Sequence, residues 1–146
     1  MARVLIMIGS KSDMQYAEEC RTVLTELGIE GVIEVSSAHR QPQRTGELAG
    51  RAAQNGFEVI ICMAGMAAAL PGVVAAQTSL PVIGVPLPAS LNGLDSLLAI
   101  AQMPSGVPVA TMSIGTAGAK NAAYLAARIL ALKDDRIRAR LPRYEN

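Results

Sequence analysis

The only histidine of this chain lies beside an arginine, directly after a run of residues that reads as a β-strand. His39 and Arg40 follow the apolar-alternating run Val32–Val35 after a short Ser-Ser-Ala turn. An imidazole has an unperturbed pKa of roughly 6.5, so it can give and take a proton near neutrality. An arginine can hold a phosphate or a carboxylate through its planar guanidinium group. The pair is compatible with acid–base chemistry on an anionic substrate, and equally with a solvated surface loop.

Five apolar runs alternate with helical patterns along the chain. The predicted strands cover residues 4–8, 31–35, 57–63, 81–86 and 109–113. The predicted helices cover about residues 13–27, 41–55, 73–78, 95–100 and 121–133, and residues 136–146 are predicted to form a surface tail. This alternation predicts an α/β protein of three αβα layers with a mostly parallel five-stranded sheet, of the flavodoxin or Rossmann type.

Length and composition predict a single domain over residues 1–146 with an aliphatic core. Hydrophobic residues make up 51% of the chain and aromatic residues only 3%. The abundant alanines of the helical segments indicate that some faces are buried against other subunits, although such helices also pack closely within one chain. Cys20 and Cys62 have no neighbouring ligands and are interpreted as buried small hydrophobic residues.

The charge balance and the first residues exclude several classes of partner. The net charge of +1 gives no argument for binding nucleic acid or a membrane surface. The apolar run at residues 4–8 is too short to span a membrane and lacks a signal-peptide pattern. We therefore expect a cytoplasmic protein that binds neither a membrane nor nucleic acid.

Two further turns are candidates for ligand contact. Residues 9–13 form a Gly-Ser-rich turn before a helix that Ser12 or Asp13 could cap, which suits an anion because N–H groups, hydroxyls and the helix dipole converge there. The small residues 64–72 allow a ligand or a neighbouring chain to approach the backbone closely. The carboxyl ends of parallel strands meet at one sheet edge, so these turns and His39 should share a crevice. The glycines near Lys120 resemble a phosphate-binding loop only superficially, because Asn121 stands where Ser or Thr is required.

A series of motifs extends in order over nearly the whole chain. They are Gly9-Ser10-Lys11-Ser12-Asp13, Ser37-Ala38-His39-Arg40 followed by Pro42, Leu70-Pro71-Gly72, Pro81-Val82-Ile83-Gly84-Val85-Pro86, Leu91-Asn92-Gly93-Leu94-Asp95-Ser96-Leu97, Gln102-Met103-Pro104, Gly106-Val107-Pro108-Val109 and Asn121-Ala122-Ala123. With these motifs the chain resembles the aminoimidazole ribonucleotide (AIR) carboxylases and mutases of purine biosynthesis.

The resemblance implies an N5-carboxyaminoimidazole ribonucleotide (N5-CAIR) mutase, an isomerase that moves a carboxylate from the exocyclic nitrogen to C4 of the imidazole. His39 would be the catalytic acid and base, and neither a metal nor a cofactor is required. Arg40 would hold the phosphate, with Asp13 on a ribose hydroxyl or near the base. The implied substrate-binding residues are Ser10, Asp13, Ser37, Arg40, Ala64, Gly65 and Leu70. The family forms homo-octamers, which agrees with the alanine-rich helices.

The loop after the third strand departs from the family pattern and leaves alternatives open. Bacterial mutases usually carry Gly-Gly-Ala-Ala-His-Leu-Pro-Gly, whereas this chain has Met66 for a glycine and Ala69 for the histidine. One alternative is the class that carboxylates AIR directly with CO2, although Arg40 and the Leu-Pro-Gly sequence favour the mutases. Another is a carboxylase of a different heteroaromatic nucleotide, such as nicotinate dinucleotide, although Met103 replaces the cysteine nucleophile of that family. The last is a nucleotide-binding paralogue without activity.

Overall fold

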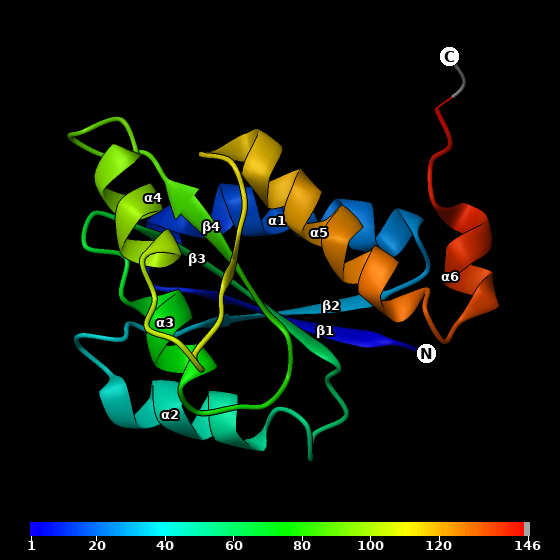
Figure 1. Cartoon of the computed structure of the whole chain (residues 1–146), viewed down its shortest axis with the longest axis horizontal. Coiled ribbons are helices and arrows are strands. Elements are labelled where there is room, and N and C mark those ends of the chain that lie inside the picture. Colours follow the sequence, from blue (N-terminus) through cyan, green and yellow to red (C-terminus); the bar gives the residue numbers. More distant parts are fainter. Residues whose placement is uncertain (145–146) are drawn as a thin grey trace.

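Five parallel strands form one sheet in the computed structural model, which describes residues 1–144 (Figure 1). The strands are β1 (Arg3–Ile8), β2 (Glu30–Val35), β3 (Val59–Gly65), β4 (Val82–Leu87) and β5 (Ala110–Thr111). The helices are the 3₁₀ helix η1 (Lys11–Asp13), α1 (Met14–Glu26), α2 (Pro42–Arg51), α3 (Leu70–Ala75), α4 (Leu94–Ala101), α5 (Thr116–Leu130) and α6 (Asp135–Arg140). The strand order is β2-β1-β3-β4-β5, the flavodoxin-like order. The predicted fold class is confirmed, with every strand pair parallel.

The three inner strands are buried on both faces, as expected for a parallel sheet covered by helices. All residues of β4 are buried, as are five of the six in β1 and six of the seven in β3. The edge strand β2 is partly exposed, and β5 has only two residues. In the ladders Ile8 pairs with both Val35 and Met63, and Gly65 pairs with Leu87. The loops that follow β1, β2, β3 and β4 therefore leave the sheet side by side.

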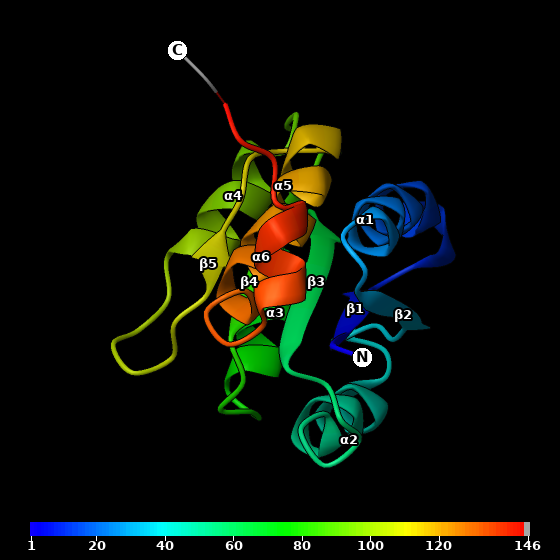
Figure 2. The ribbon, with the colours of Figure 1, turned by 90° about the vertical axis from the view of Figure 1, so that its right-hand side faces the viewer.

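The helices divide between the two faces of the sheet. Helices α1, α5 and α6 pack on one face, and α2, α3 and α4 on the other. Figure 2 shows α1 and α2 on opposite sides of β1 and β2. None of the helices within residues 1–144 is long and apolar enough to cross a membrane.

The alanines of α5 are buried by the chain's own core. Ala119, Ala122, Ala123 and Ala126 have no exposed surface and belong to the cluster that also contains the buried face of α1. These alanines therefore follow the second of the two explanations, because their small size serves the close approach of α5 to its own sheet and to α1. Contacts with other subunits stay a prediction.

Helix α5 begins five residues earlier than the predicted start at Asn121. The start is set by Gly115, whose φ of +80° is a conformation that glycine adopts readily and other residues avoid. Within the first turn, a Cβ on Gly118 would lie 1.7 Å from the carbonyl oxygen of Ser113. These glycines serve a helix start and close packing, and the structure offers no phosphate loop in this stretch.

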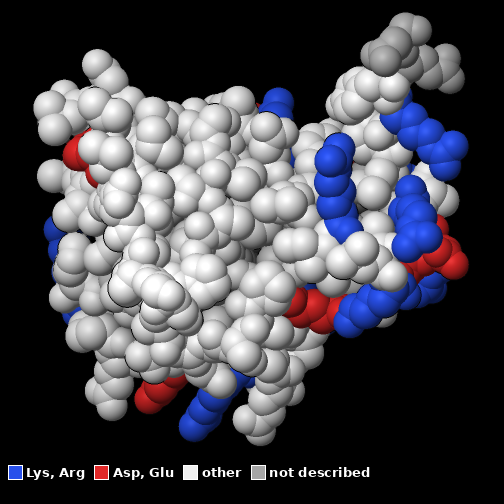
Figure 3. Space-filling model, in the orientation of Figure 1, with Lys and Arg blue, Asp and Glu red and all other residues white. Residues whose placement is uncertain are grey.

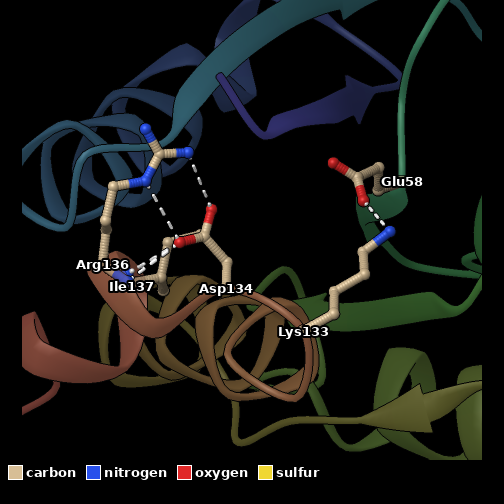
Figure 4. Close-up of polar contacts among 5 residues, drawn as sticks. All are labelled: Glu58, Lys133, Asp134, Arg136 and Ile137. Carbon is tan, nitrogen blue, oxygen red and sulfur yellow. Dashed lines mark hydrogen bonds and ion pairs between the residues drawn. The ribbon is translucent and has the colours of Figure 1, made fainter.

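The predicted surface tail is partly wrong, because residues 135–140 form α6. Ile137 is only 3% exposed and packs in the core beside α5. Asp134 caps the helix: one of its carboxylate oxygens accepts from the N–H groups of Arg136 (2.9 Å) and Ile137 (3.4 Å) (Figure 4). The neighbouring Lys133 pairs with Glu58, which joins the start of α6 to the segment before β3 (Figure 4). The short amphipathic pattern after a capping aspartate was the available signal. The last predicted tail residues, 145 and 146, lie outside the described residues.

Both cysteines are buried and unbonded, which confirms their interpretation as small hydrophobic residues. Cys20 lies in α1 and Cys62 in β3. Burial raises the pKa of the Cys20 thiol to about 12 and also raises that of Cys62, so both remain protonated thiols at neutral pH.

We predict that Asp134→Ala lowers the thermal unfolding midpoint of the protein more than Asp135→Ala does. The hydrogen bond from the Arg136 side chain makes the largest contribution to lowering the pKa of Asp134. The ionised form of Asp134 therefore stabilises the folded state. This stabilisation is present above the unfolded-state pKa of about 3.9 and is lost as the pH falls through the lower folded-state pKa. Calorimetry at neutral and acidic pH measures the difference. Equal midpoints for the two variants at neutral pH would contradict the capping role.

Candidate active site

A cavity of about 500 Å³ opens at the carboxyl edge of the sheet. The loops after β1 and β2 contribute its more polar side, lined by Gly9, Ser10, Ser12, Asp13, Ser37, Ala38, His39 and Arg40. The loops after β3 and β4 contribute its apolar side, lined by Ala64, Gly65, Met66, Ala67, Ala68, Ala69, Leu70, Leu87, Pro88 and Ala89. In a sheet of this order, β1 and β3 flank the topological switch point, where ligands bind in open α/β proteins.

Every residue that the sequence analysis selected for the site lines this one cavity. These residues are Ser10, Asp13, Ser37, His39, Arg40, Ala64, Gly65 and Leu70. Sequence reasoning did not select the stretch Leu87–Ala89, which it treated as an ordinary loop. Its position directly after a buried strand was the signal that could have found it, because residues after β4 meet the same sheet edge.

The turn after β1 is held by the hydroxyl of Ser10. This oxygen accepts from the backbone N–H of Ser12 at 3.2 Å and from its hydroxyl at 2.9 Å. Asp13 occupies the position before α1 but makes no side-chain capping bond, so the prediction that Ser12 or Asp13 caps the helix was wrong. The carboxylate of Asp13 is left facing the cavity, and burial raises its pKa despite a hydrogen bond from the Ser10 backbone.

The turn that carries His39 and Arg40 is closed by Ser37. The Ser37 hydroxyl accepts from the N–H of Arg40 at 3.1 Å, and its carbonyl accepts from the N–H of Gln41 at 2.8 Å. Both His39 and Arg40 are exposed. Within residues 1–144, neither side chain takes part in a hydrogen bond or ion pair of the protein, so both can bind a ligand without breaking an internal contact.

A buried pair of hydroxyls fixes this turn to α2. Ser36 and Thr45 are fully buried, and their oxygens lie 2.7 Å apart. The N–H of Ser36 donates to the carbonyl of Ile8 at 2.8 Å, which also ties the turn to β1. A buried hydroxyl without a partner is costly, so the Ser36–Thr45 bond locks the distance between the end of β2 and the helix. The flexible-looking Ser-Ser-Ala-His-Arg turn is thus anchored at its first residue.

The apolar side of the cavity contains two residues in strained backbone conformations. Met66 has a φ of +54° and Ala68 a φ of +36°, which L-residues rarely adopt. The N–H of Ala68 donates to the carbonyl of Gly65 at 3.0 Å, so the chain reverses sharply at the end of β3. Leu70 then begins α3 and is only 2% exposed, which places most of its side chain in the core.

The loop after β4 is fixed by α4. Ser96 is fully buried, and its hydroxyl lies 2.9 Å from the carbonyl oxygens of both Leu87 and Gly93. This contact holds the end of β4 against the first turn of α4, so Leu87–Ala89 has a defined position beside Gly65. A buried serine in the Asn-Gly-Leu-Asp-Ser motif therefore has a structural purpose: it shapes the apolar side of the cavity.

The arrangement suits a small anionic molecule with an apolar portion. Asp13, His39 and Arg40 are the titratable or charged side chains among the lining residues, and all three come from the β1 and β2 loops. The β3 and β4 loops contribute aliphatic side chains and backbone. An anion would bind beside Arg40 and the serines, and a planar apolar group beside the alanines, with His39 as the proton carrier. Within the described residues, no three His, Cys, Asp or Glu side chains are placed to hold a metal ion.

Comparison with known proteins identifies the family. The family model "AIR carboxylase" matches residues 3–146. A protein of Saccharolobus solfataricus named N5-carboxyaminoimidazole ribonucleotide mutase is 56% identical over 134 residues, which cover 91% of this chain and 84% of the relative. The protein of the same name from Escherichia coli is 51% identical over 144 residues, which cover 96% of this chain and 83% of the relative. This chain belongs to the AIR carboxylase family.

A solved structure supports the same assignment. The crystal structure of Treponema denticola PurE superposes with a TM-score of 0.87 at 34% identity, covering 97% of this chain and 87% of that chain. The family resemblance inferred from the motifs is thus confirmed. The contributions of individual residues to binding and catalysis stay predictions.

We predict that Asp13→Asn raises the unfolding midpoint at neutral pH. Because burial raises the folded-state pKa of Asp13, its ionised form costs stability above that pKa, and the cost disappears below the unfolded-state pKa of about 3.9. The gain from asparagine should therefore be larger at pH 7 than near pH 3.5. Thermal unfolding at several pH values measures the gain, and a gain independent of pH would contradict the sign of the shift. The same variant should bind nucleotide more weakly if Asp13 contacts the ligand.

Proposed function

We propose that this chain is an N5-CAIR mutase of purine biosynthesis, which converts N5-CAIR to 4-carboxyaminoimidazole ribonucleotide (CAIR). The observation that carries the proposal is the meeting of the sole histidine with Arg40, Ser10 and Asp13 at one cavity, in a chain 56% identical to a named mutase. Relatives of that name at 50–56% identity support an enzyme of the isomerase type.

In the proposed complex the nucleotide spans the two sides of the cavity. Arg40 and the hydroxyl of Ser10 bind the 5′-phosphate, and Asp13 accepts from a ribose hydroxyl or lies near the base. Ser37 and the backbone at Ala64 and Gly65 line the imidazole and the reacting carboxylate. The unpaired side chain of Arg40 and the anchored turn below it support this placement, because a preformed site loses little entropy when the ligand binds.

The reaction requires one proton to be delivered and one to be removed. The bond between the exocyclic nitrogen and the carboxylate breaks, CO2 leaves, and the nitrogen takes a proton. C4 of the resulting AIR then attacks CO2, and the C4 proton leaves to restore the aromatic ring. His39 performs both transfers, first as an acid and then as a base, so that it ends in its starting state. The cavity contributes by holding CO2 beside C4, since positioning replaces a bimolecular encounter.

A homo-oligomer, with an octamer as the expected state, completes the proposal. Leu94 and Leu98 on α4 and Leu91 just before it are between 51% and 63% exposed. Figure 3 shows a broad surface with few Lys, Arg, Asp or Glu side chains on the α4 side of the molecule, whereas charged side chains gather around α6. Large exposed apolar residues on an uncharged face are typical of a subunit interface. The cytoplasmic location expected from the sequence stays a prediction.

An assay with two substrates tests the function. The purified protein receives N5-CAIR at low bicarbonate, or AIR with high bicarbonate, and CAIR is followed by absorbance. We expect product from N5-CAIR at low bicarbonate. Product only from AIR with high bicarbonate would make the protein a direct carboxylase, and silence with both substrates would favour a different nucleotide or a paralogue without activity.

Substitutions at His39 and Arg40 should separate chemistry from binding. His39→Asn is expected to lower kcat by about 10²–10⁴ while nucleotide binding persists, because the proton carrier is lost. Arg40→Ala should mainly weaken binding, by roughly 10- to 100-fold, because charged hydrogen bonds contribute about 1.5–3 kcal/mol. Arg51→Ala removes the same charge from the last residue of α2, outside the cavity lining, and is the matched control. An equal loss of binding and turnover in the His39 variant would contradict the acid–base assignment.

The oligomer should depend on the apolar α4 face. We predict that Leu94→Glu with Leu98→Glu lowers the mass measured by light scattering, because charges would have to be buried at the interface. Leu132→Glu changes a leucine that is even more exposed, at 80%, but lies near the charged α6 side, and should leave the mass unchanged. An unchanged mass in the double variant would place the interface elsewhere.

A further inference from the structure

Met66 has two unfavourable features at the entrance of the cavity. Its side chain is 64% exposed although it is large and apolar. Its φ of +54° is one that glycine adopts without steric cost and that an L-side chain disfavours. It directly follows β3 and lines the cavity. An exposed methionine buries little surface in the fold, so the isolated fold gains little from this side chain, and a glycine would suit the backbone better.

The position of Met66 on the cavity indicates which part of a bound substrate would cover its side chain. It belongs to the apolar side of the cavity, together with the alanines from Ala67 to Ala69 and the stretch Leu87–Ala89. The charged lining residues Asp13, His39 and Arg40 come from the other two loops. In the proposed reaction the phosphate and ribose need the charged loops, whereas the imidazole and free CO2 are the apolar parts of the complex. Met66 is therefore on the side where CO2 would be held.

We infer that Met66 closes the cavity over the imidazole and CO2 and keeps the released CO2 from exchanging with solvent. This inference rests on the proposed mutase function and assigns a water-excluding role to one side chain. Because Met66 lines the cavity and is largely exposed, substrate bound beside it would give its thioether chain the apolar contact that the fold does not. Methionine suits this task because its unbranched chain adapts to an irregular surface. The cost of CO2 escape is loss of the carboxylate and release of AIR.

Isotope retention tests the assignment. N5-CAIR is turned over in ¹³C-bicarbonate buffer with carbonic anhydrase, so that any CO2 that leaves the cavity is replaced by labelled CO2. Met66→Gly should raise both the ¹³C content of CAIR and the AIR released per CAIR by about tenfold or more, because one lost methylene contact in a closed pocket is already worth about tenfold. Met66→Leu keeps the apolar bulk and should retain carbon as the wild type does. Wild-type retention in Met66→Gly would overturn the assignment.

Matched controls separate the side chain from the backbone. Met66→Gly relieves a positive φ, so its unfolding midpoint should not fall, and loss of retention would not reflect unfolding. Asn92 also has a positive φ, +57°, but lies outside the cavity lining. Asn92→Gly should leave retention unchanged. An equal loss of retention in Asn92→Gly would show that backbone changes, and not the Met66 side chain, control CO2 escape, and would overturn the assignment.

A binding measurement tests the same contact without turnover. In ¹³C-methyl-methionine protein, the Met66 signal is identified by its absence in Met66→Leu. Adding AIR should shift this signal and reduce its relaxation by a soluble gadolinium chelate. Equal relaxation with and without AIR would mean that bound AIR does not cover Met66 and would overturn the assignment. A wild type that neither binds AIR nor forms CAIR would overturn the proposed function and the assignment together.

Discussion

The parallel pairing of β1 with β2 on one side and with β3 on the other is the constraint on which the site depends. Ile8 is paired with Val35 in one ladder and with Met63 in the other, so three loops leave the sheet at one edge. The connections carry helices to opposite faces, which leaves this edge uncovered between them. Residues more than 50 positions apart in sequence, such as Asp13 and Gly65, thereby line one cavity.

The site is held by a few buried polar contacts and is otherwise free to bind. The Ser36–Thr45 bond and the Ser96 hydroxyl fix the turns on the two sides of the cavity, while His39 and Arg40 remain exposed. Because a buried hydroxyl without a hydrogen-bond partner is costly, these buried hydrogen bonds are kept and hold the turns rigid. The side chains of His39 and Arg40 contribute little to the fold, so a ligand can contact them without breaking an internal bond.

Three residues of the cavity lining lower the stability of the folded chain. The partly buried Asp13 carboxylate has a raised pKa, and Met66 and Ala68 adopt positive φ values. Each feature raises the free energy of the folded chain, and each lies on the cavity. Strain and burial that gather at a ligand site are typical of preorganised sites, in which ligand contacts offset the cost. Away from the cavity, Gly115 meets a similar backbone demand at the start of α5 without strain, and Asn92 is the one other non-glycine residue with a positive φ among the described residues.

The sequence by itself determined the strand and helix alternation, the burial of the cysteines, the family, and the polar residues that meet at the cavity. Apolar runs and short motifs are local signals, and they can be read without knowing which segments pack together. It did not determine where α5 begins, that residues 135–140 form a helix, or that the α5 alanines pack internally. These outcomes depend on contacts between distant segments, such as Gly118 against Ser113 and Ile137 against the core. The strained conformation of Met66 was equally hidden, because a backbone angle is fixed by the tertiary positions of both ends of a turn.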